Sequence, residues 1–125
     1  MEKRALIVED DPVHQELLKD ILEGCGWSTR GVAGVAEALS ELEAGGFALV
    51  ITDVYLPDAT GLELCRRIKS NPASSGIPVL VTTGAFLDSA LTRLAEELGA
   101  DEFLGKPLRL RQFLGAVDRL VAAVA

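Results

Sequence analysis

Four short apolar runs in this chain each lead into polar residues that could take part in chemistry. The runs and the groups after them are 4–8 with Glu9, Asp10 and Asp11, 47–52 with Asp53, 77–81 with Thr82, Thr83 and Gly84, and 102–105 with Lys106. If the runs are strands of one open parallel sheet, their carboxyl ends lie at one edge, where such sheets bind ligands. Carboxylates, a hydroxyl and an amine gathered there would form a site for a metal ion and a phosphate group.

The acidic part of this predicted site consists of Glu9, Asp10 and Asp53. Three carboxylates close together repel one another, so some take up protons unless a cation neutralises them. Mg²⁺ suits such a cluster, because it prefers hard oxygen ligands and usually takes one or two carboxylates together with phosphate oxygens. The run from Glu9 to Asp11 also fits a solvated acidic surface, with Asp11 capping a helix that begins at Pro12.

Asp53 is the candidate nucleophile, because it places a charge at the end of an apolar strand and carboxylates can form aspartyl phosphates. The Lys106 ammonium could bind a phosphate oxygen, or pair with Asp53 when no phosphate is bound. Pro107 restricts Lys106 to extended conformations, which aims its side chain from the strand end. The Thr83 hydroxyl could donate to another phosphate oxygen, and Gly84 leaves room for the backbone to approach.

The elements that must position these groups follow from the apolar pattern. Unbroken apolar runs predict strands that are buried on both faces, and helical spacing predicts helices between them. The expected strands are 4–8, 27–32, 47–52, 77–81 and 101–105, and the expected helices are 12 to 24 or 26, 35–44, 61–70, 87–98 and 107–124. Alternation of five strands with five helices implies an α/β fold with a doubly wound parallel sheet, although the pattern leaves the strand order open.

Length and composition narrow the function classes. The 125 residues fit a single domain, and the net charge of −7 argues against direct nucleic-acid binding, which needs a basic face. No apolar run approaches the ~20 residues that cross a bilayer, and the first residues do not resemble a signal peptide. We therefore expect a cytoplasmic protein without membrane contact. Cys25 and Cys65 form no metal-binding motif and are expected to be buried, reduced thiols.

Taken together, these motifs resemble the receiver domains of two-component response regulators of the chemotaxis-regulator type, over essentially the whole chain. The matching stretches are 6–11, 51–61, 78–84 and 99–107. The resemblance implies a flavodoxin-like (βα)5 fold with the strand order 2-1-3-4-5 that is known for this family. It also implies that residues 1–125 are a single receiver domain, with no effector domain in this chain.

The resemblance implies that Asp53 accepts a phosphoryl group from phosphohistidine on a histidine kinase or a histidine phosphotransfer protein. The implied ligands of Mg²⁺, or of Mn²⁺ in its place, are Glu9, Asp10, Asp53 and the backbone carbonyl of Tyr55. Thr83, Gly84 and Lys106 would lie against the phosphate. Such a protein is a signalling switch that promotes its own phosphorylation and its own slow dephosphorylation, and it does not turn over an external substrate.

Switching in the family couples the Thr83 hydroxyl to an aromatic ring on the last strand, here Phe103. The family often has Tyr at this position, and Phe103 cannot make a hydrogen bond from its ring. Phe103 also fits an ordinary core aromatic. Tyr55 and Ala85 offer no carboxylate or amide that would orient an attacking water, which predicts slow loss of the phosphoryl group. His14 is expected to be an exposed helical residue, rather than a second phosphoryl site or a kinase contact.

The last two helices are the expected protein-binding face, for a downstream protein or a homodimer. The residues expected to be exposed there are Arg109, Arg111, Gln112, Asp118 and Arg119. The apolar end, 120–125, fits either burial against a partner or a frayed terminus. Two other function classes stay open at lower weight: a small phosphohydrolase with an aspartate nucleophile, and a flavodoxin-like or nucleotide-binding protein. The latter would need a hydroxyl- or glycine-rich loop where Glu9 and Asp10 stand.

Overall fold

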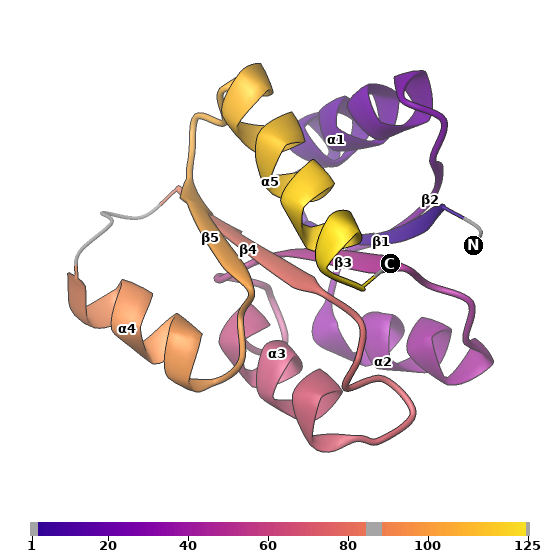
Figure 1. Ribbon diagram of the computed structural model, residues 1–125. Coiled ribbons are helices and arrows are strands. Elements are labelled where there is room, and N and C mark those ends of the chain that lie inside the picture. Colours follow the sequence, from indigo (N-terminus) through magenta and orange to yellow (C-terminus); the bar gives the residue numbers. More distant parts are fainter. Residues whose placement is uncertain (1–2, 85–88, 125) are drawn as a thin grey trace.

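A computed structural model describes residues 3–84 and 89–124 and places them in a parallel β-sheet between two layers of helices (Figure 1). The strands are β1 (Arg4–Val8), β2 (Ser28–Val32), β3 (Leu49–Asp53), β4 (Val79–Thr83) and β5 (Glu102–Gly105). The helices are α1 (Pro12–Gly24), α2 (Val35–Ala44), α3 (Gly61–Ser70), α4 (Ser89–Glu97) and α5 (Leu110–Val124). The strand order is β2-β1-β3-β4-β5 and every pairing is parallel, so the predicted fold class and order are confirmed.

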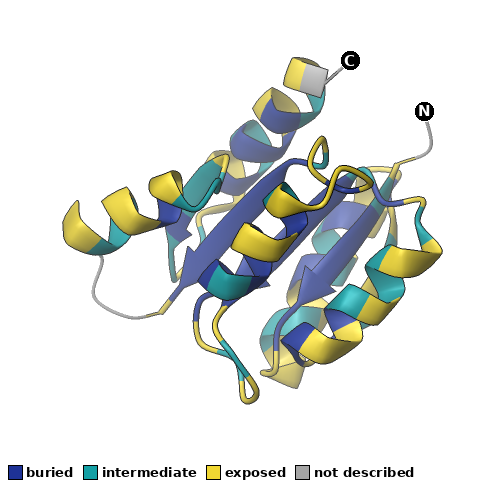
Figure 2. Cartoon of the chain, turned by 90° about the horizontal axis from the view of Figure 1, so that it is seen from below, coloured by how far each residue is buried: buried dark blue, intermediate teal, exposed yellow. Residues whose placement is uncertain are grey.

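The two faces of the sheet carry separate apolar clusters, and this explains why the central strands lack alternation in the sequence. Leu6 and Val8 of β1 pack on the side of α2, α3 and α4, while Ala5 and Ile7 pack on the side of α1 and α5. Successive side chains of a strand point to opposite faces, so a strand covered on both sides is apolar throughout. Figure 2 shows the continuous buried band that results.

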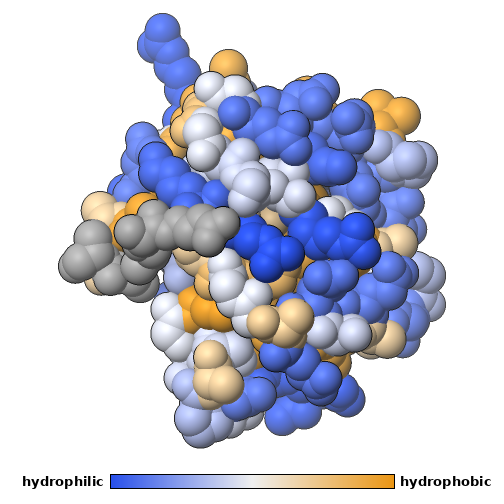
Figure 3. Space-filling view, turned by 90° about the vertical axis from the view of Figure 1, so that its right-hand side faces the viewer, coloured by the Kyte–Doolittle hydropathy of each residue, from blue (hydrophilic) through white to orange (hydrophobic). Residues whose placement is uncertain are grey.

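The edge strand β2 is more polar than the central strands, because only part of it is covered. Its exposed residues include Ser28 and Arg30, and Arg30 pairs with Glu41 of α2 at 3.0 Å. The side of the molecule that carries β2 is mostly hydrophilic, with scattered apolar side chains (Figure 3). A polar edge of this kind resists pairing with another sheet. Within residues 3–84 and 89–124, no helix has the length and apolar character needed to cross a bilayer.

The observed bounds of β1, α2 and α3 agree with the predicted ones, whereas two central strands are displaced. β3 and β4 begin two residues later than predicted and extend through Asp53 and Thr83. The parallel ladder continues to the pair of Asp53 with Thr82, so the strands persist beyond the apolar runs. Asp53 and Thr83 are therefore the last residues of β3 and β4, so their backbones are fixed in the sheet.

The predicted start of the last helix at Pro107 was wrong, since α5 begins at Leu110. The Lys106–Pro107 peptide bond is cis, and the Lys106 amide donates to the Thr83 carbonyl at 2.7 Å. The hydrogen bond between the Lys106 amide and the Thr83 carbonyl holds the backbone of Lys106 in line with β5. The residues between β5 and α5 consequently form a connection rather than a helical turn.

The apolar stripe of α1 is only partly buried. Asp11 caps it by accepting a hydrogen bond from the Val13 amide, as the sequence indicated, and Leu18 and Leu22 are buried. The helical spacing of the apolar residues predicts that Val13, Leu17, Leu18, Ile21 and Leu22 form one stripe that faces the core. This prediction is wrong for Val13 and Leu17, which are 78% and 52% exposed. The helix carries apolar residues over a wider arc than the sheet can cover, so these two face solvent.

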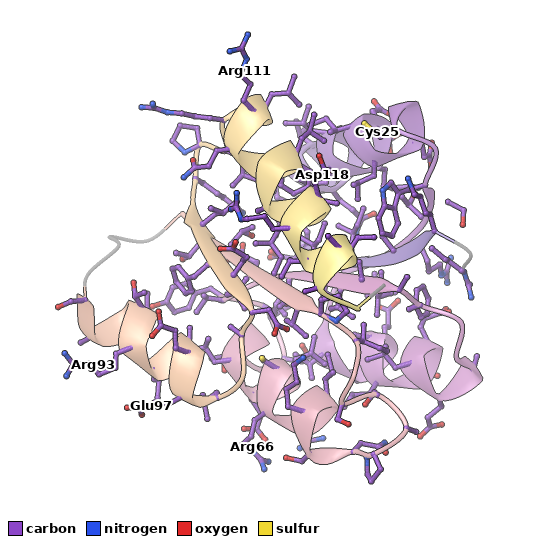
Figure 4. All side chains as sticks on the ribbon, viewed as in Figure 1. Cys25, Arg66, Arg93, Glu97, Arg111 and Asp118 are labelled. Atoms are coloured by element: carbon purple, nitrogen blue, oxygen red, sulfur yellow. The ribbon has the colours of Figure 1, made fainter. Side chains whose placement is uncertain are left out.

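The end of α5 packs on its own sheet. Leu120 is buried in the cluster shared with α1, and Val121 packs against the same cluster, whereas Ala122 and Ala123 are exposed. The five polar residues of α5 and its preceding turn are exposed as predicted, and Arg119 pairs with Glu102 at 2.9 Å. In Figure 4 the Arg111 side chain extends away from the sheet.

The two cysteines differ in environment, which corrects the prediction that both are buried. Cys25 lies exposed at the end of α1 (Figure 4), while Cys65 of α3 is buried and donates to the Leu98 carbonyl at 3.5 Å. Burial raises the pKa of the Cys65 thiol to about 11, so it stays protonated and unreactive.

A thiol reagent is therefore expected to modify Cys25 alone in the folded protein, and both cysteines in denaturant. Intact mass after iodoacetamide treatment, with and without denaturant, measures this. Two labels on the native protein at equal rates would contradict the buried position of Cys65.

Candidate functional site

Three carboxylates meet at the carboxyl edge of the sheet. β1 and β3 are neighbours in register, with Val8 beside Thr52, so Glu9 and Asp53 leave the sheet side by side. One oxygen each of Glu9, Asp10 and Asp53 lies within 4.8 Å of the other two. Glu9 is 2% exposed and Asp53 is 9% exposed, while Asp10 is open to solvent. The cluster is thus buried on one side and accessible on the other.

Lys106 spans the acidic cluster from the far edge of the sheet. Its Nζ lies 2.6 Å from Glu9 Oε1 and 2.9 Å from Asp53 Oδ2. The side chain starts at the end of β5 and passes Gly84, where an added Cβ would lie 3.7 Å from Lys106 Cδ. The expectation that Lys106 pairs with Asp53 in the absence of phosphate agrees with this contact. The Lys106 ammonium therefore forms ion pairs with two carboxylates, those of Glu9 and Asp53, rather than with Asp53 alone.

Burial and charge together set the protonation of this cluster. Burial raises the pKa of Glu9 to about 7; hydrogen bonds from Lys106 oppose the rise, and the neighbouring Asp53 adds to it. Burial by itself lowers the pKa of Lys106, but its bonds to Glu9 and Asp53 outweigh burial and raise it. The lysine accordingly stays charged, while Glu9 exchanges a proton near neutral pH.

The cluster fits a divalent cation by its chemistry and by one unsatisfied atom. Glu9 Oε2 is buried, and among the described residues it has no hydrogen-bond partner. A buried carboxylate oxygen without a donor costs free energy, which a cation would offset. Three carboxylates open to water on one side match the oxygen ligands that Mg²⁺ and Mn²⁺ accept.

The affinity for Mg²⁺ is expected to depend on pH through Glu9. Glu9 is an expected ligand and could bind metal only as the carboxylate, so below about pH 7 Mg²⁺ binding there would displace a proton from it. The dissociation constant should therefore rise by up to about tenfold per unit of falling pH, and level off above the pKa. Isothermal titration calorimetry between mildly acidic and mildly alkaline pH measures this. Glu9→Gln should bind more weakly and lose the slope; an unchanged slope would assign the proton elsewhere.

Thr83 and Phe103 lie on adjacent strands and on one face of the sheet. Thr83 is the fully buried last residue of β4, and the register pairs it with Gly105 and pairs Val81 with Phe103. Phe103 therefore sits diagonally from Thr83, two residues back along the strand. Its half-buried side chain packs against the buried cluster that includes Val81 of β4 and Ala95 of α4. Phe103 thus lies on the strand next to Thr83 and shares one apolar layer with the buried side of α4.

The loop from β3 to α3 approaches Asp53 very closely. The Tyr55 amide donates to Asp53 Oδ1 at 3.3 Å, and the Gly61 amide donates to the Val54 carbonyl at 2.7 Å. A Cβ at Gly61 would lie 1.9 Å from the Asp53 carbonyl oxygen, so only glycine fits there. The Tyr55 side chain is 58% exposed. Ala85, the other position named for phosphoryl lifetime, lies outside the described residues.

Two residues of α1 lie closer to the site than the sequence indicated: the predicted exposure of His14 was wrong, and Gln15 was not identified. His14, expected to be exposed, has a side chain only 14% exposed, with Nε2 3.9 Å from Glu9 Oε1. Burial, and then the Lys106 charge, lower the pKa of His14, which favours neutral imidazole. Gln15 Nε2 donates to the carbonyls of Glu9 and Val32 at 2.9 and 3.1 Å and so fixes the backbone of Glu9. Helical spacing gives no signal for either contact.

Comparison with known proteins agrees with this site and fold. A family model described as the response regulator receiver domain matches residues 5–118. The transcriptional regulatory protein GltR of Pseudomonas aeruginosa is 40% identical over 119 residues, which are 93% of this chain and 48% of GltR. The DNA-binding response regulator MtrA of Mycolicibacterium smegmatis is 32% identical over 117 residues, covering 94% of this chain and 50% of MtrA. The chain spans about half the length of these relatives.

Solved structures show the same likeness. The signal receiver domain of a signal transduction histidine kinase from Syntrophus aciditrophicus has 37% sequence identity and a TM-score of 0.89, and the match covers 98% of this chain and 92% of that one. The phosphohydrolase and nucleotide-binding alternatives find no comparable support in these likenesses. Because the family model spans nearly the whole chain and the fold agrees, the chain belongs to the receiver domains of two-component response regulators.

Proposed function

We propose that this receiver domain accepts a phosphoryl group from phosphohistidine on Asp53 and thereby changes its protein-binding face. The observation that carries the proposal is the position of the Asp53 carboxylate, which lies beside Glu9 and Asp10 and within 2.9 Å of the Lys106 ammonium. A carboxylate nucleophile with the Lys106 ammonium beside one of its oxygens is suited to attack on phosphorus. The donor would be a histidine kinase or a histidine phosphotransfer protein.

In the proposed reaction, one carboxylate oxygen of Asp53 attacks phosphorus in line with the phosphorus–nitrogen bond of phosphohistidine. The new oxygen–phosphorus bond forms as the phosphorus–nitrogen bond breaks, and the imidazole nitrogen leaves with the electron pair. Glu9, Asp10, Asp53 and the Tyr55 carbonyl would hold Mg²⁺. When bound, the metal offsets negative charge on the phosphoryl oxygens.

The remaining residues of the site would respond to the phosphoryl group. Lys106, which shares Glu9 and Asp53, would exchange one of these contacts for a phosphate oxygen. The Thr83 hydroxyl would donate to another oxygen, while Gly84 keeps the approach open. Movement of Thr83 would let the Phe103 ring change its packing under α4, which alters the face made by α4 and α5. The net charge of −7 supports protein partners there rather than nucleic acid.

Helix α1 offers a docking surface for the phosphohistidine donor beside the acceptor. Val13 and Leu17 are large, exposed apolar side chains on the first turns of α1, directly after the acidic run. They lie in a shallow surface depression lined by Pro12, Val13, Glu16, Leu17 and Asp20. Exposed apolar side chains with a polar rim are typical of protein contacts.

Leu17→Glu is expected to lower the rate of transfer from a phosphorylated protein donor by about tenfold while leaving phosphorylation by acetyl phosphate unchanged. Leu94→Glu, at an exposed leucine of α4, is the matched control and should leave both rates unchanged. Radiolabel transfer and intact mass measure the two rates. Equal loss with both donors would place the defect in the site and not in docking.

The proposed function is tested by incubating the protein with Mg²⁺ and acetyl phosphate. A single phosphoryl adduct should form only in the presence of Mg²⁺, should fail to form when a chelator is present from the start, and should be cleaved by hydroxylamine as an acyl phosphate is. It should decay slowly, since the Tyr55 side chain offers no carboxylate or amide to orient water. Absence of an adduct would overturn the proposal, and catalytic turnover of external phosphate esters would favour a phosphohydrolase.

A further inference from the structure

We propose that Asp58 is a positioning residue for the phosphoryl site, because its carboxylate ties the loop that carries Tyr55 to the amino end of α2. The inference deepens the proposed function, in which the Tyr55 carbonyl is a metal ligand. Asp58 lies in the loop between β3 and α3, five residues beyond Asp53, and its carboxylate bonds backbone amides of α2 rather than side chains of the acidic cluster. Its effect would pass through the backbone of the loop.

The first observation is that α2 has no cap of its own. Its N-cap residue is Gly34, which supplies no side chain to the free amides of the first turn. Asp58 supplies the missing acceptor: Oδ1 accepts from the Val35 amide at 2.9 Å and Oδ2 accepts from the Ala36 amide at 3.0 Å. One carboxylate thus binds two adjacent helix amides from a segment more than twenty residues away along the chain.

The second observation is that Gly34 and Asp58 fit each other. A Cβ at Gly34 would lie 2.8 Å from Asp58 Oδ1 and 3.1 Å from Oδ2 and Cγ, so a side chain there would push the carboxylate away. Bonds from the Ala36 and Val35 amides also lower the pKa of Asp58. The contact between loop and helix is therefore close, charged and dependent on a residue of each segment.

The third observation is that the loop is closed at its base as well as anchored near its tip. The Gly61 amide bonds the Val54 carbonyl at 2.7 Å, and Tyr55 forms a backbone bridge with Thr60. Asp58 lies between these bridged residues. With base and tip both fixed, the main chain of Tyr55 is held against Asp53, to whose Oδ1 its amide donates. A ligand that is fixed in advance needs less ordering when the metal arrives, which strengthens binding.

Asp58→Ala is therefore expected to raise the dissociation constant for Mg²⁺ by about tenfold, the lower end of the effect of partners that orient metal ligands. In phosphorylation by acetyl phosphate, the half-saturating Mg²⁺ concentration should rise by the same factor, while the rate at saturating Mg²⁺ stays unchanged. Asp58→Asn keeps one oxygen acceptor and should recover part of the affinity. Gly34→Ala displaces the carboxylate from the helix side, without changing the loop, and should reproduce the loss.

The matched control is Thr60→Ala, which removes a cap of similar strength from α3 in the same loop, where Thr60 Oγ1 accepts from the Glu63 amide at 3.1 Å. Calorimetry of Mg²⁺ binding and thermal unfolding are measured on all variants. The inference would be overturned if Asp58→Ala lost only as much stability as Thr60→Ala and if Mg²⁺ affinity were unchanged in Asp58→Ala, Thr60→Ala and Gly34→Ala. In that case Asp58 would act only as a helix cap. A wild-type protein that binds Mg²⁺ but takes no phosphoryl group would overturn the proposed function alone, since the binding comparison still decides the role of Asp58.

Discussion

Replacing Asp53 by Asn is expected to abolish the phosphoryl adduct completely. The amide has almost the shape of the carboxylate but is not a nucleophile toward phosphorus, so the new oxygen–phosphorus bond cannot form. The substitution also removes the charge that Lys106 contacts at 2.9 Å, although Glu9 still holds the ammonium at 2.6 Å. The lysine should therefore keep its place, and the fold should persist. Intact mass after incubation with Mg²⁺ and acetyl phosphate measures the loss.

Asp11→Asn is the matched control for this experiment. It removes one negative charge from the acidic run at the same edge, and Asn caps a helix about as well as Asp, so α1 should keep its first turn. The adduct should form in this variant at close to the wild-type rate. An adduct of full stoichiometry on Asp53→Asn would show that another group is the acceptor.

Gly61→Ala is expected to destabilise the domain by about 3 kcal/mol, a large part of the roughly 5–15 kcal/mol that such domains possess. The added Cβ would lie 1.9 Å from the Asp53 carbonyl oxygen and 2.8 Å from Thr52 Oγ1. The first of these is a backbone atom at the end of the central strand β3, so it cannot move aside as a flexible side chain can. Either β3 or the start of α3 must shift, and both carry the site.

The melting temperature of Gly61→Ala should accordingly fall by roughly 10 °C, measured by calorimetry or circular dichroism. Gly24→Ala is the matched control, since a Cβ at Gly24 meets nothing within 4 Å and Gly24 ends α1 with an ordinary φ angle. That variant should be neutral or slightly stabilised. Equal melting temperatures for the two variants would contradict the close approach at Gly61.

The fold could be predicted because the strands are covered on both faces. Continuous apolar runs such as 4–8 stand out from the amphipathic helices, and the alternation of the two patterns leaves few topologies. The acidic cluster and Lys106 could be predicted for the same reason, since each follows a strand whose end must lie at one edge. Their protonation could not, because the pKa of Glu9 depends on how deeply the side chain is buried.

The errors occurred where the sequence does not say which neighbour covers a residue. Helical spacing shows that Val13 and Leu17 share an apolar arc with Leu18, but the limited width of the sheet decides which of them face solvent. The same ambiguity hid the burial of the His14 side chain against Glu9. Asp58 reads locally as part of a turn, and its bonds to α2 join segments with no pattern in common.

The ion pairs of Lys106 have a consequence for how the protein is made. They join residues 97 and 53 positions apart, so Glu9 and Asp53 leave the ribosome well before Lys106. Chains emerge and fold from the amino terminus onward. Until β5 docks at the edge of the sheet, Glu9 and Asp53 face each other without a counter-charge and Thr83 lacks the backbone bond from Lys106. The nascent chain therefore carries the proposed acceptor Asp53 in an incomplete site, and the proposed phosphoryl transfer would become possible only when β5 has docked.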